Sequence, residues 1–159
     1  MHIPVLMREV IELLNPKAGK TFIDATVNGG GHFAGIYKEL GSQGILLGID
    51  MDCALIERLE TMYQHQHDGI KTIFVCGNFR DIREIATAHH IERADGILFD
   101  LGFSSYHIEQ SGRGFSFLRD EPLDMRYAPD KADVTAEVVI NGWPKEKLID
   151  IFGKYGAIR

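Results

Sequence analysis

Four short apolar segments, separated by segments of helical periodicity, constrain the fold of this chain more than any other feature. The apolar segments begin at residues 20, 44, 71 and 94 and read KTFIDATV, GILLGID, KTIFVC and ADGILFDLG. Apolar residues at helical spacing precede the first segment and separate the others, over residues 32–40, 53–63 and 81–90. This alternation predicts parallel β-α-β units, and therefore an α/β fold with a doubly wound, mostly parallel sheet.

Length, charge and cysteine content limit the possible functions. A chain of 159 residues can build one core but hardly two, and a net charge of −6 excludes diffuse, nonspecific binding of nucleic acid. Cys53 and Cys76 match no metal-ligand spacing, so we predict two separate reduced thiols in a cytoplasmic protein. No apolar stretch predicts a membrane span. No metal site is predicted either, because no acid or cysteine stands at ligand spacing from the histidines His65, His67, His89 and His90.

A run of small residues follows the first predicted strand and precedes a predicted helix. It reads Asn28, Gly29, Gly30, Gly31, and glycines at such a turn let a ligand approach the backbone while helix amides bind its negative charge. Asp50 ends the second predicted strand, where an acid would bind ribose hydroxyls. The pattern favours a nucleoside cofactor over a turn without a ligand. It leaves open whether that cofactor is a dinucleotide or S-adenosylmethionine.

Two residues outside the turn favour S-adenosylmethionine. Asp24 lies inside the first predicted strand, and Phe79 follows the third, where its ring could stack on a purine. This arrangement suits a cofactor that has one adenosine and no pyrophosphate. The carboxylate of S-adenosylmethionine would also meet the amides of the glycine turn.

Motifs along the whole chain resemble the MraW (RsmH) family of small-subunit ribosomal RNA methyltransferases. In order they read HIPVLMREV, DATVNGGGH, GIDMD, GNF, DGILFDLGFSS, RGFSF, PLDMR and KYG. The resemblance implies a class I S-adenosylmethionine-dependent methyltransferase, Rossmann-like in fold, that methylates N4 of a cytidine in the decoding region of the small ribosomal subunit RNA. The cofactor contacts it implies here are Asn28, Gly29, Gly30, Gly31, His32, Asp50, Met51, Asn78, Phe79, Asp100 and His107.

The chain departs from the family pattern at several points. Asn28 stands where the family usually has glycine, His107 where it usually has glutamine, and YGAI replaces YGEE near the end. Family members are also considerably longer, which implies a fragment or a shortened relative. On this basis residues 1–131 are predicted to be the cofactor-binding domain, and residues 132–159 a short helical segment that starts an inserted helical domain.

The chemistry of methyl transfer suggests roles for residues after the fourth strand. The exocyclic nitrogen of cytosine is a weak nucleophile and must be oriented, so we predict catalytic roles for Asp100, Ser104 and Ser105. Asp100 could instead only bind the cofactor, and the serines could only form a turn. A flipped cytosine and the RNA phosphates would be bound by Phe103, Arg113, Phe115 and Arg126. Core packing of the phenylalanines, Phe117 above all, and ion pairs to Asp120 or Asp124 are the alternatives.

Two other classes of function stay open from the sequence. One is a noncatalytic S-adenosylmethionine-binding or ribosome-associated module, and the other is a nicotinamide-dependent dehydrogenase, which accounts for the glycine turn but not for the later motifs. If the strands follow the usual order, the fourth forms an apolar sheet edge. The following loop, the terminal helices or a second chain in a homodimer would then cover that edge.

Overall fold

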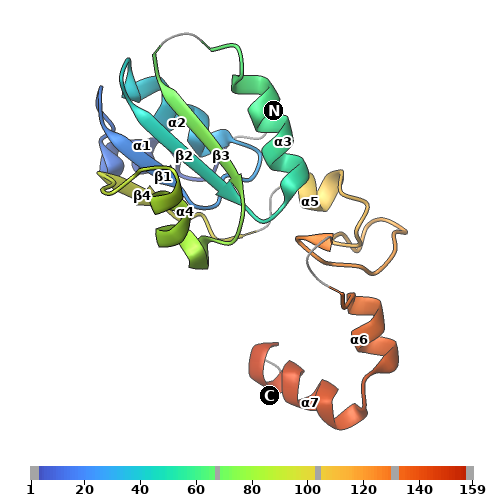
Figure 1. Ribbon diagram of the computed structural model, residues 1–159. Coiled ribbons are helices and arrows are strands. Elements are labelled where there is room, and N and C mark those ends of the chain that lie inside the picture. Colours follow the sequence, from blue (N-terminus) through green and yellow to red (C-terminus); the bar gives the residue numbers. More distant parts are fainter. Residues whose placement is uncertain (1–3, 67–68, 103–104, 130–132, 157–159) are drawn as a thin grey trace. The chain divides into compact units, whose positions relative to one another are not determined.

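The computed structural model describes residues 4–66, 69–102, 105–129 and 133–156. The chain divides into two compact units, Met1–Ser104 and Ser105–Arg159, each described here by itself (Figure 1). The division falls earlier in the chain than the domain boundary predicted after residue 131. Where the cofactor-binding domain ends therefore stays a prediction.

The first unit is built on a four-stranded sheet whose strands are all parallel. The strands are ordered β3-β2-β1-β4, with bounds β1 Thr21–Asp24, β2 Ile45–Asp50, β3 Lys71–Cys76 and β4 Gly96–Leu98 (Figure 1). In register, Ile23 of β1 pairs with Leu47 of β2 and with Ile97 of β4. This order is that of doubly wound nucleotide-binding sheets, which confirms the predicted fold class.

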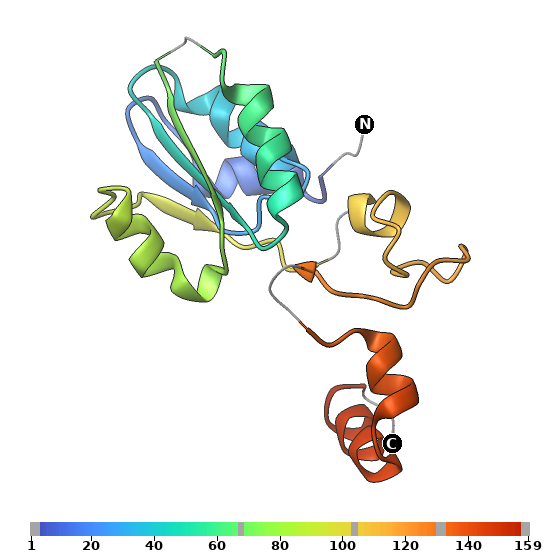
Figure 2. The ribbon, with the colours of Figure 1, turned by 45° about the vertical axis from the view of Figure 1, so that its right-hand side comes forward.

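Helices lie on both faces of this sheet (Figure 2). On one face are α1 (Met7–Leu14), α2 (Gly31–Leu40) and α3 (Cys53–Tyr63). On the other is α4 (Ile82–Ala88), which follows a 3-10 turn, η1 (Phe79–Asp81). Side chains alternate between the faces of a strand, so consecutive residues of one strand serve two different cores.

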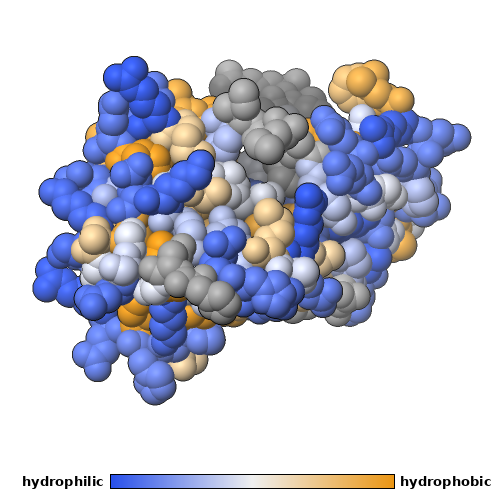
Figure 3. All heavy atoms as spheres, turned by 90° about the horizontal axis from the view of Figure 1, so that it is seen from above, coloured by the Kyte–Doolittle hydropathy of each residue, from blue (hydrophilic) through white to orange (hydrophobic). Residues whose placement is uncertain are grey.

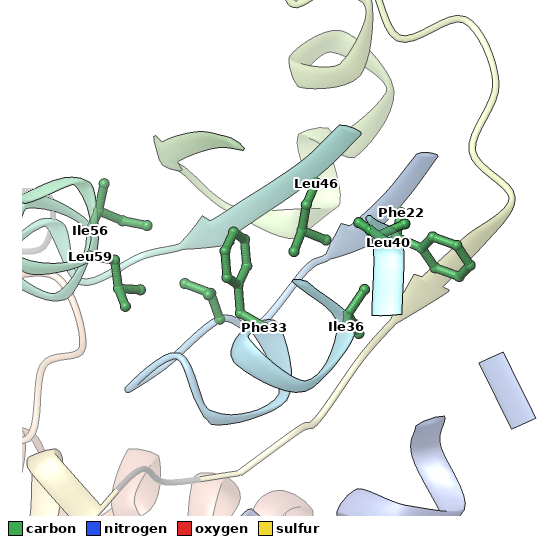
Figure 4. Packing of buried hydrophobic residues seen from close by; sticks show 8 residues of the cluster. Phe22, Phe33, Ile36, Leu40, Leu46, Ile56 and Leu59 are labelled. Carbon is green, nitrogen blue, oxygen red and sulfur yellow. The ribbon is translucent and has the colours of Figure 1, made fainter. Parts of the chain in front are cut away.

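The larger core cluster lies between the sheet and the helices α2 and α3. Phe33 of α2 is fully buried, and its ring centroid lies 4.7 Å from that of Phe74 and 5.2 Å from that of Tyr63. Figure 4 shows the labelled members of this cluster, which come from β1, α2, β2 and α3: Phe22, Phe33, Ile36, Leu40, Leu46, Ile56 and Leu59. This packing fixes α2 against the strands, and so fixes the turn that precedes α2.

The fourth strand is an edge of the sheet, as predicted. Among the described residues it pairs with β1 alone, and apolar side chains along it and after it are exposed: Ile97, Phe99 and Leu101. What covers this edge stays a prediction. On the face shown in Figure 3, hydrophobic residues form small separate patches among hydrophilic ones. Among the described residues, no helix has both the length and the hydropathy needed to cross a bilayer.

The second unit contains three helices among its described residues. These are α5 (Ser105–Glu109), α6 (Ala136–Gly142) and α7 (Lys145–Tyr155). The segment after Gly102, which is called a loop above, contains the helix α5; its five residues are too few to show a helical period in the sequence. The helical character predicted for residues 132–159 is confirmed at α6 and α7. These two helices are separated at Trp143 and Pro144, since a proline favours an extended residue before it.

Candidate functional site

The glycine turn connects the end of β1 to the start of α2. Asn28 and Gly30 have positive φ angles of 46° and 80°, and the Gly30 N–H donates to the carbonyl oxygen of Val27 at 2.8 Å. Asparagine tolerates the left-handed region, which explains how Asn28 replaces a glycine here. Gly30 is the N-cap of α2 and offers no side-chain hydrogen bond to the helix. The first amides of α2 therefore point toward any anionic group that lies above the turn.

Asp50, the last residue of β2, is hydrogen-bonded to the turn that follows β1. Its Oδ2 accepts a hydrogen bond from the Asn28 N–H at 2.8 Å, and its Oδ1 accepts one from the Asp52 N–H at 2.9 Å. A carboxylate has about four acceptor positions, so these bonds are compatible with ribose hydroxyls as further donors. Asp50 thus shapes the glycine turn and also stands at the carboxyl end of β2, the position predicted for a ribose acceptor. The sequence pattern indicated only the second of these roles.

Asp24 is a buried carboxyl group directly before the turn. It is 1% exposed, its Oδ1 accepts from the Thr26 N–H at 3.2 Å, and its Oδ2 has no hydrogen-bond partner among the described residues. Burial above all, together with the charges of Asp50 and Asp100, raises the pKa of Asp24 from 3.8 to about 7, although the hydrogen bond from the Thr26 N–H lowers it. Near neutral pH this group is therefore present in both its neutral and its ionised form.

Asp100 follows β4 and lies at the same end of the sheet. Its backbone N–H donates to Oγ1 of Thr26 at 2.7 Å, which anchors it to the segment between β1 and the turn, while its side chain is 48% exposed. Oδ2 of Asp100 lies 3.5 Å from Nδ1 of His32, on the first turn of α2. The structure therefore brings Asp24, Asp50 and Asp100 together at the carboxyl ends of three parallel strands.

Residues after β2 and β3 line the next part of this edge. Asn78 uses its side chain to cap η1, accepting from the Arg80 N–H at 3.0 Å. The ring of Phe79 is 36% exposed and packs edge-on against Phe99 at 5.6 Å. Met51 follows Asp50 directly and places its carbonyl oxygen 3.8 Å from Sγ of Cys76. Phe79 thus offers a partly exposed aromatic surface of the kind that a flat base can contact.

The two cysteines form a disulfide, so the prediction of separate reduced thiols was wrong. Cys53 and Cys76 are bonded, with their Cα atoms 5.0 Å apart. Cys76 ends β3 in register with Asp50, and Cys53 begins α3 shortly after Asp50, so parallel pairing brings the two side chains together. The bond joins the segments that follow β2 and β3. Since disulfides occur mainly in oxidising compartments, the cysteines no longer support a reducing setting.

The remaining predicted site residues lie in the second unit or outside the described residues. Phe103 and Ser104 are outside them, and Ser105 begins α5. His107 is fully buried in α5, with ring contacts to Phe115 at 5.4 Å and to Tyr127 at 4.7 Å.

Both predicted RNA-binding arginines make contacts inside their own unit. Arg113 donates to the carbonyl oxygens of Arg126 and Tyr127 at 2.8 and 2.9 Å. Arg126 forms the ion pair with Asp124 that the sequence offered as its alternative, at 2.7 Å. Phe117, for which core packing was predicted, is instead 97% exposed. It lies in an irregular loop, where no hydrophobic period forces a side chain inward.

A parallel sheet in the order 3-2-1-4, with a glycine turn after β1 and an acid at the end of β2, defines a Rossmann-like nucleotide-cofactor-binding domain. The chain belongs to the MraW methylase family, whose family model matches residues 1–159. It is 43% identical over 159 residues to ribosomal RNA small subunit methyltransferase H of Dictyoglomus thermophilum, covering 98% of this chain and 52% of that protein.

Other curated relatives show the same relation. The protein of the same name from Desulfosudis oleivorans is 40% identical and covers 99% of this chain and 50% of its own length. That from Clostridium botulinum is 39% identical and covers 98% of this chain and 49% of its own length. The chain therefore spans about half the length of the curated relatives it matches. A solved protein-L-isoaspartate O-methyltransferase is 20% identical to this chain, covering 47% of this chain and 23% of that protein, with a TM-score of 0.40.

Sequence reasoning missed two residues of the site. Thr26 holds the backbone of Asp100, and the carbonyl oxygen of Val5 lies 2.9 Å from Nε2 of His32. Both residues lie within the motifs DATVNGGGH and HIPVLMREV. Nothing in the spacing of these motifs indicates the contacts, because they join segments that are distant in the sequence. Among the described residues, no group of three or more His, Cys, Asp or Glu side chains is arranged to hold a metal ion.

Proposed function

We propose that this chain is the cofactor-binding part of an S-adenosylmethionine-dependent methyltransferase that acts on N4 of a cytidine in small-subunit ribosomal RNA. The family and the names of the relatives support methyl transfer to this RNA. The observation that carries the proposal is the hydrogen bond from the Asn28 N–H to the Asp50 carboxylate. It holds the proposed ribose acceptor directly beside the glycine turn. A cytoplasmic location belongs to the proposal and rests on the RNA substrate.

The residues at the strand ends fit S-adenosylmethionine. The backbone amides of Gly29, Gly31 and His32 would hold its carboxylate over the turn that Gly30 forms with Val27, and Asp50 would bind its ribose hydroxyls. Phe79, with Met51 and Asn78 beside it, would contact its adenine. The buried Oδ2 of Asp24, which has no partner among the described residues, is a further polar atom at this position. The cofactor supplies a methyl group on a positively charged sulfur. His107 stays a predicted contact from the second unit.

Asp100 would accept a proton from the amino group of the base. Its backbone is anchored by Thr26 while its carboxylate is half exposed, so it can reach a substrate above the strand ends. Holding the amino nitrogen in line with the methyl group and sulfur provides much of the rate acceleration in such a transfer. Ser104, Ser105, Phe103 and Phe115 are proposed to orient the base, and Arg113 and Arg126 to contact phosphates. A homodimer that covers β4 stays a proposal.

A noncatalytic S-adenosylmethionine-binding module is the second candidate. It is favoured by the two arginines of the second unit, because Arg113 already donates to two backbone carbonyls and Arg126 already pairs with Asp124. Incubation of the chain with undermethylated small ribosomal subunits and labelled S-adenosylmethionine separates the candidates. Label incorporation that Asp100→Ala abolishes supports the enzyme, whereas cofactor binding without incorporation supports the module.

Asp50→Ala is expected to weaken S-adenosylmethionine binding by about tenfold or more, because hydrogen bonds to a charged group contribute about 1.5–3 kcal/mol each. Isothermal titration of the unmodified chain and the variant measures this loss. Asp95→Ala is the matched control, since the Asp95 carboxylate accepts hydrogen bonds from the Thr21 N–H and the Lys20 side chain at the amino end of the sheet. The affinity of this variant for S-adenosylmethionine should equal that of the unmodified chain. Binding of NAD in place of S-adenosylmethionine would reject the proposed cofactor.

A further inference from the structure

A disulfide joins the two segments that follow β2 and β3, beside the proposed cofactor site. Cys53 is the first residue of α3, Cys76 is the last residue of β3, and their Cα atoms are 5.0 Å apart. This separation lies within the ordinary range for bonded cysteines. The bond therefore connects two segments that the parallel sheet already places side by side.

Residues proposed to contact the cofactor lie close to both cysteines. Met51 stands two residues before Cys53, and Phe79 stands three residues after Cys76. Sγ of Cys76 also lies 3.8 Å from the carbonyl oxygen of Met51. Neither cysteine is itself proposed to touch the cofactor. The disulfide can therefore influence cofactor binding only through the segments on either side of it.

The regular ladder between β2 and β3 ends where these segments begin. Asp50 of β2 pairs in register with Cys76 of β3, and the Gly77 N–H donates to the carbonyl oxygen of Asp50 at 2.8 Å. Both strands end at this pair, so the residues that follow lie outside the ladder. A covalent bond at this point restricts how far the two segments can separate.

The bond has a reversible chemistry with external thiols. Cys53 and Cys76 are both half-buried, so neither is sealed in the core. An external thiolate attacks one sulfur and forms a mixed disulfide, and a second external thiol then releases the protein sulfur. Two molecules of a monothiol such as glutathione thus become one disulfide, while two electrons and two protons pass to the two cysteines. Oxidised glutathione reverses the exchange.

We infer that this disulfide is a reversible redox modification site that sets the affinity of the chain for S-adenosylmethionine. The inference rests on the function proposed above, which implies a cytoplasmic protein. Disulfides in such proteins are usually transient, and either catalytic or redox-sensing. The formed bond holds the segments of Met51 and Phe79 together, so less ordering is needed when the cofactor binds. Reduction to two thiols frees these segments and weakens binding.

The cofactor affinity of the whole chain in two redox states tests this inference. The Kd for S-adenosylmethionine is measured by isothermal titration after equilibration with oxidised or with reduced glutathione. We expect the Kd to be about tenfold higher for the reduced chain. A double variant, Cys53→Ser with Cys76→Ser, is the matched control, because it cannot form the bond. Its Kd should equal that of the reduced chain under both conditions.

Two results of this titration would overturn the inference. One is a difference of less than about threefold between the two states of the unmodified chain, since the bond would then contribute little ordering. The other is an equal difference in the double variant, since the effect would then come from glutathione and not from the bond.

The midpoint potential of the disulfide gives a second readout that needs no variant. Coupling between two sites is reciprocal, so S-adenosylmethionine must favour the bonded form by the same factor by which the bond favours the cofactor. For this two-electron couple a tenfold factor corresponds to about 30 mV, so saturating cofactor should lower the midpoint potential by about that amount. Alkylation of free thiols at a series of glutathione ratios, followed by mass spectrometry, measures the midpoint. An unchanged midpoint would overturn the inference.

Failure of the redox site and failure of the proposed function give different results. Equal affinity of the oxidised and reduced chains, or free thiols at every glutathione ratio, would remove the redox site and leave the proposed function intact. A chain that has the bond formed but binds no S-adenosylmethionine would instead reject the proposed cofactor, and with it this role of the disulfide.

Discussion

Gly30→Ala is expected to lower the free energy of unfolding by about 2–4 kcal/mol, through backbone strain and overpacking together. Gly30 has a φ of 80°, a conformation that costs an alanine about 1–2 kcal/mol. The new Cβ would also lie 2.5 Å from Cδ2 of Leu59, which is itself buried in the core cluster and cannot move into solvent. Urea denaturation in the absence of cofactor, monitored by circular dichroism, measures the change in the free energy of unfolding.

The adjacent glycine provides a matched control. Gly29 lacks a positive φ, and a Cβ built on it meets nothing within 4 Å. Gly29→Ala should therefore change the free energy of unfolding by less than about 0.5 kcal/mol. If the two variants lose the same stability, the left-handed turn at Gly30 does not have the structural role described above.

Asp24→Asn is expected to make the chain more stable at pH 8, by up to about 4 kcal/mol, and to leave its stability almost unchanged at pH 4. The ordinary pKa of an aspartate side chain, 3.8, applies to Asp24 in the unfolded chain, whereas in the folded chain the pKa of Asp24 is about 7. This difference is about three pKa units, each worth about 1.4 kcal/mol. Asparagine has the shape of the neutral acid and removes the cost of a buried charge.

The sign of the pH dependence follows from proton binding. Between pH 4 and 7 the folded chain keeps the proton on Asp24, while the unfolded chain loses it, so stability falls as pH rises through this window. Above the folded-state pKa both states are ionised and the loss is complete. Urea midpoints measured from pH 4 to pH 8 should therefore fall more steeply for the unmodified chain than for Asp24→Asn.

Asp95→Asn is the control for this slope. The Thr21 N–H and Lys20 lower the pKa of Asp95, so its contribution is present above the ordinary pKa and is lost only as pH falls. Between pH 5 and 8 any stability difference between Asp95→Asn and the unmodified chain should be constant, so the two pH profiles should have the same slope. Parallel pH profiles for Asp24→Asn and the unmodified chain would show that Asp24 is ionised throughout this range.

Local patterns were sufficient for most elements of the first unit. Residues 71–76 and 53–63 were predicted with the bounds that β3 and α3 have, because apolar periodicity is a property of each segment alone. The strand predicted over 94–102 was too long, since β4 covers only Gly96–Leu98. An edge strand has a single neighbour, and its ladder ends where that neighbour ends. Sequence patterns do not contain this information.

The candidate site was predictable in outline for the same reason. The glycine turn and Asp50 were recognisable because parallel strands place their carboxyl ends at one edge of the sheet. The bond from the Asn28 N–H to Asp50 was not, because it depends on the register of β1 against β2. The arginines after Gly102 were interpreted from their charge, and their contacts with backbone carbonyls appear only in the folded second unit.

The order of helices and strands, the place of the glycine turn and the acid at the end of the second strand were determined by the sequence itself, because each is a local pattern. Tertiary structure alone decided the disulfide between Cys53 and Cys76, the raised pKa of Asp24 and the partners of His32. The physical reason is that covalent pairing, desolvation and hydrogen bonding depend on which distant segments the fold brings together. No single segment contains that information.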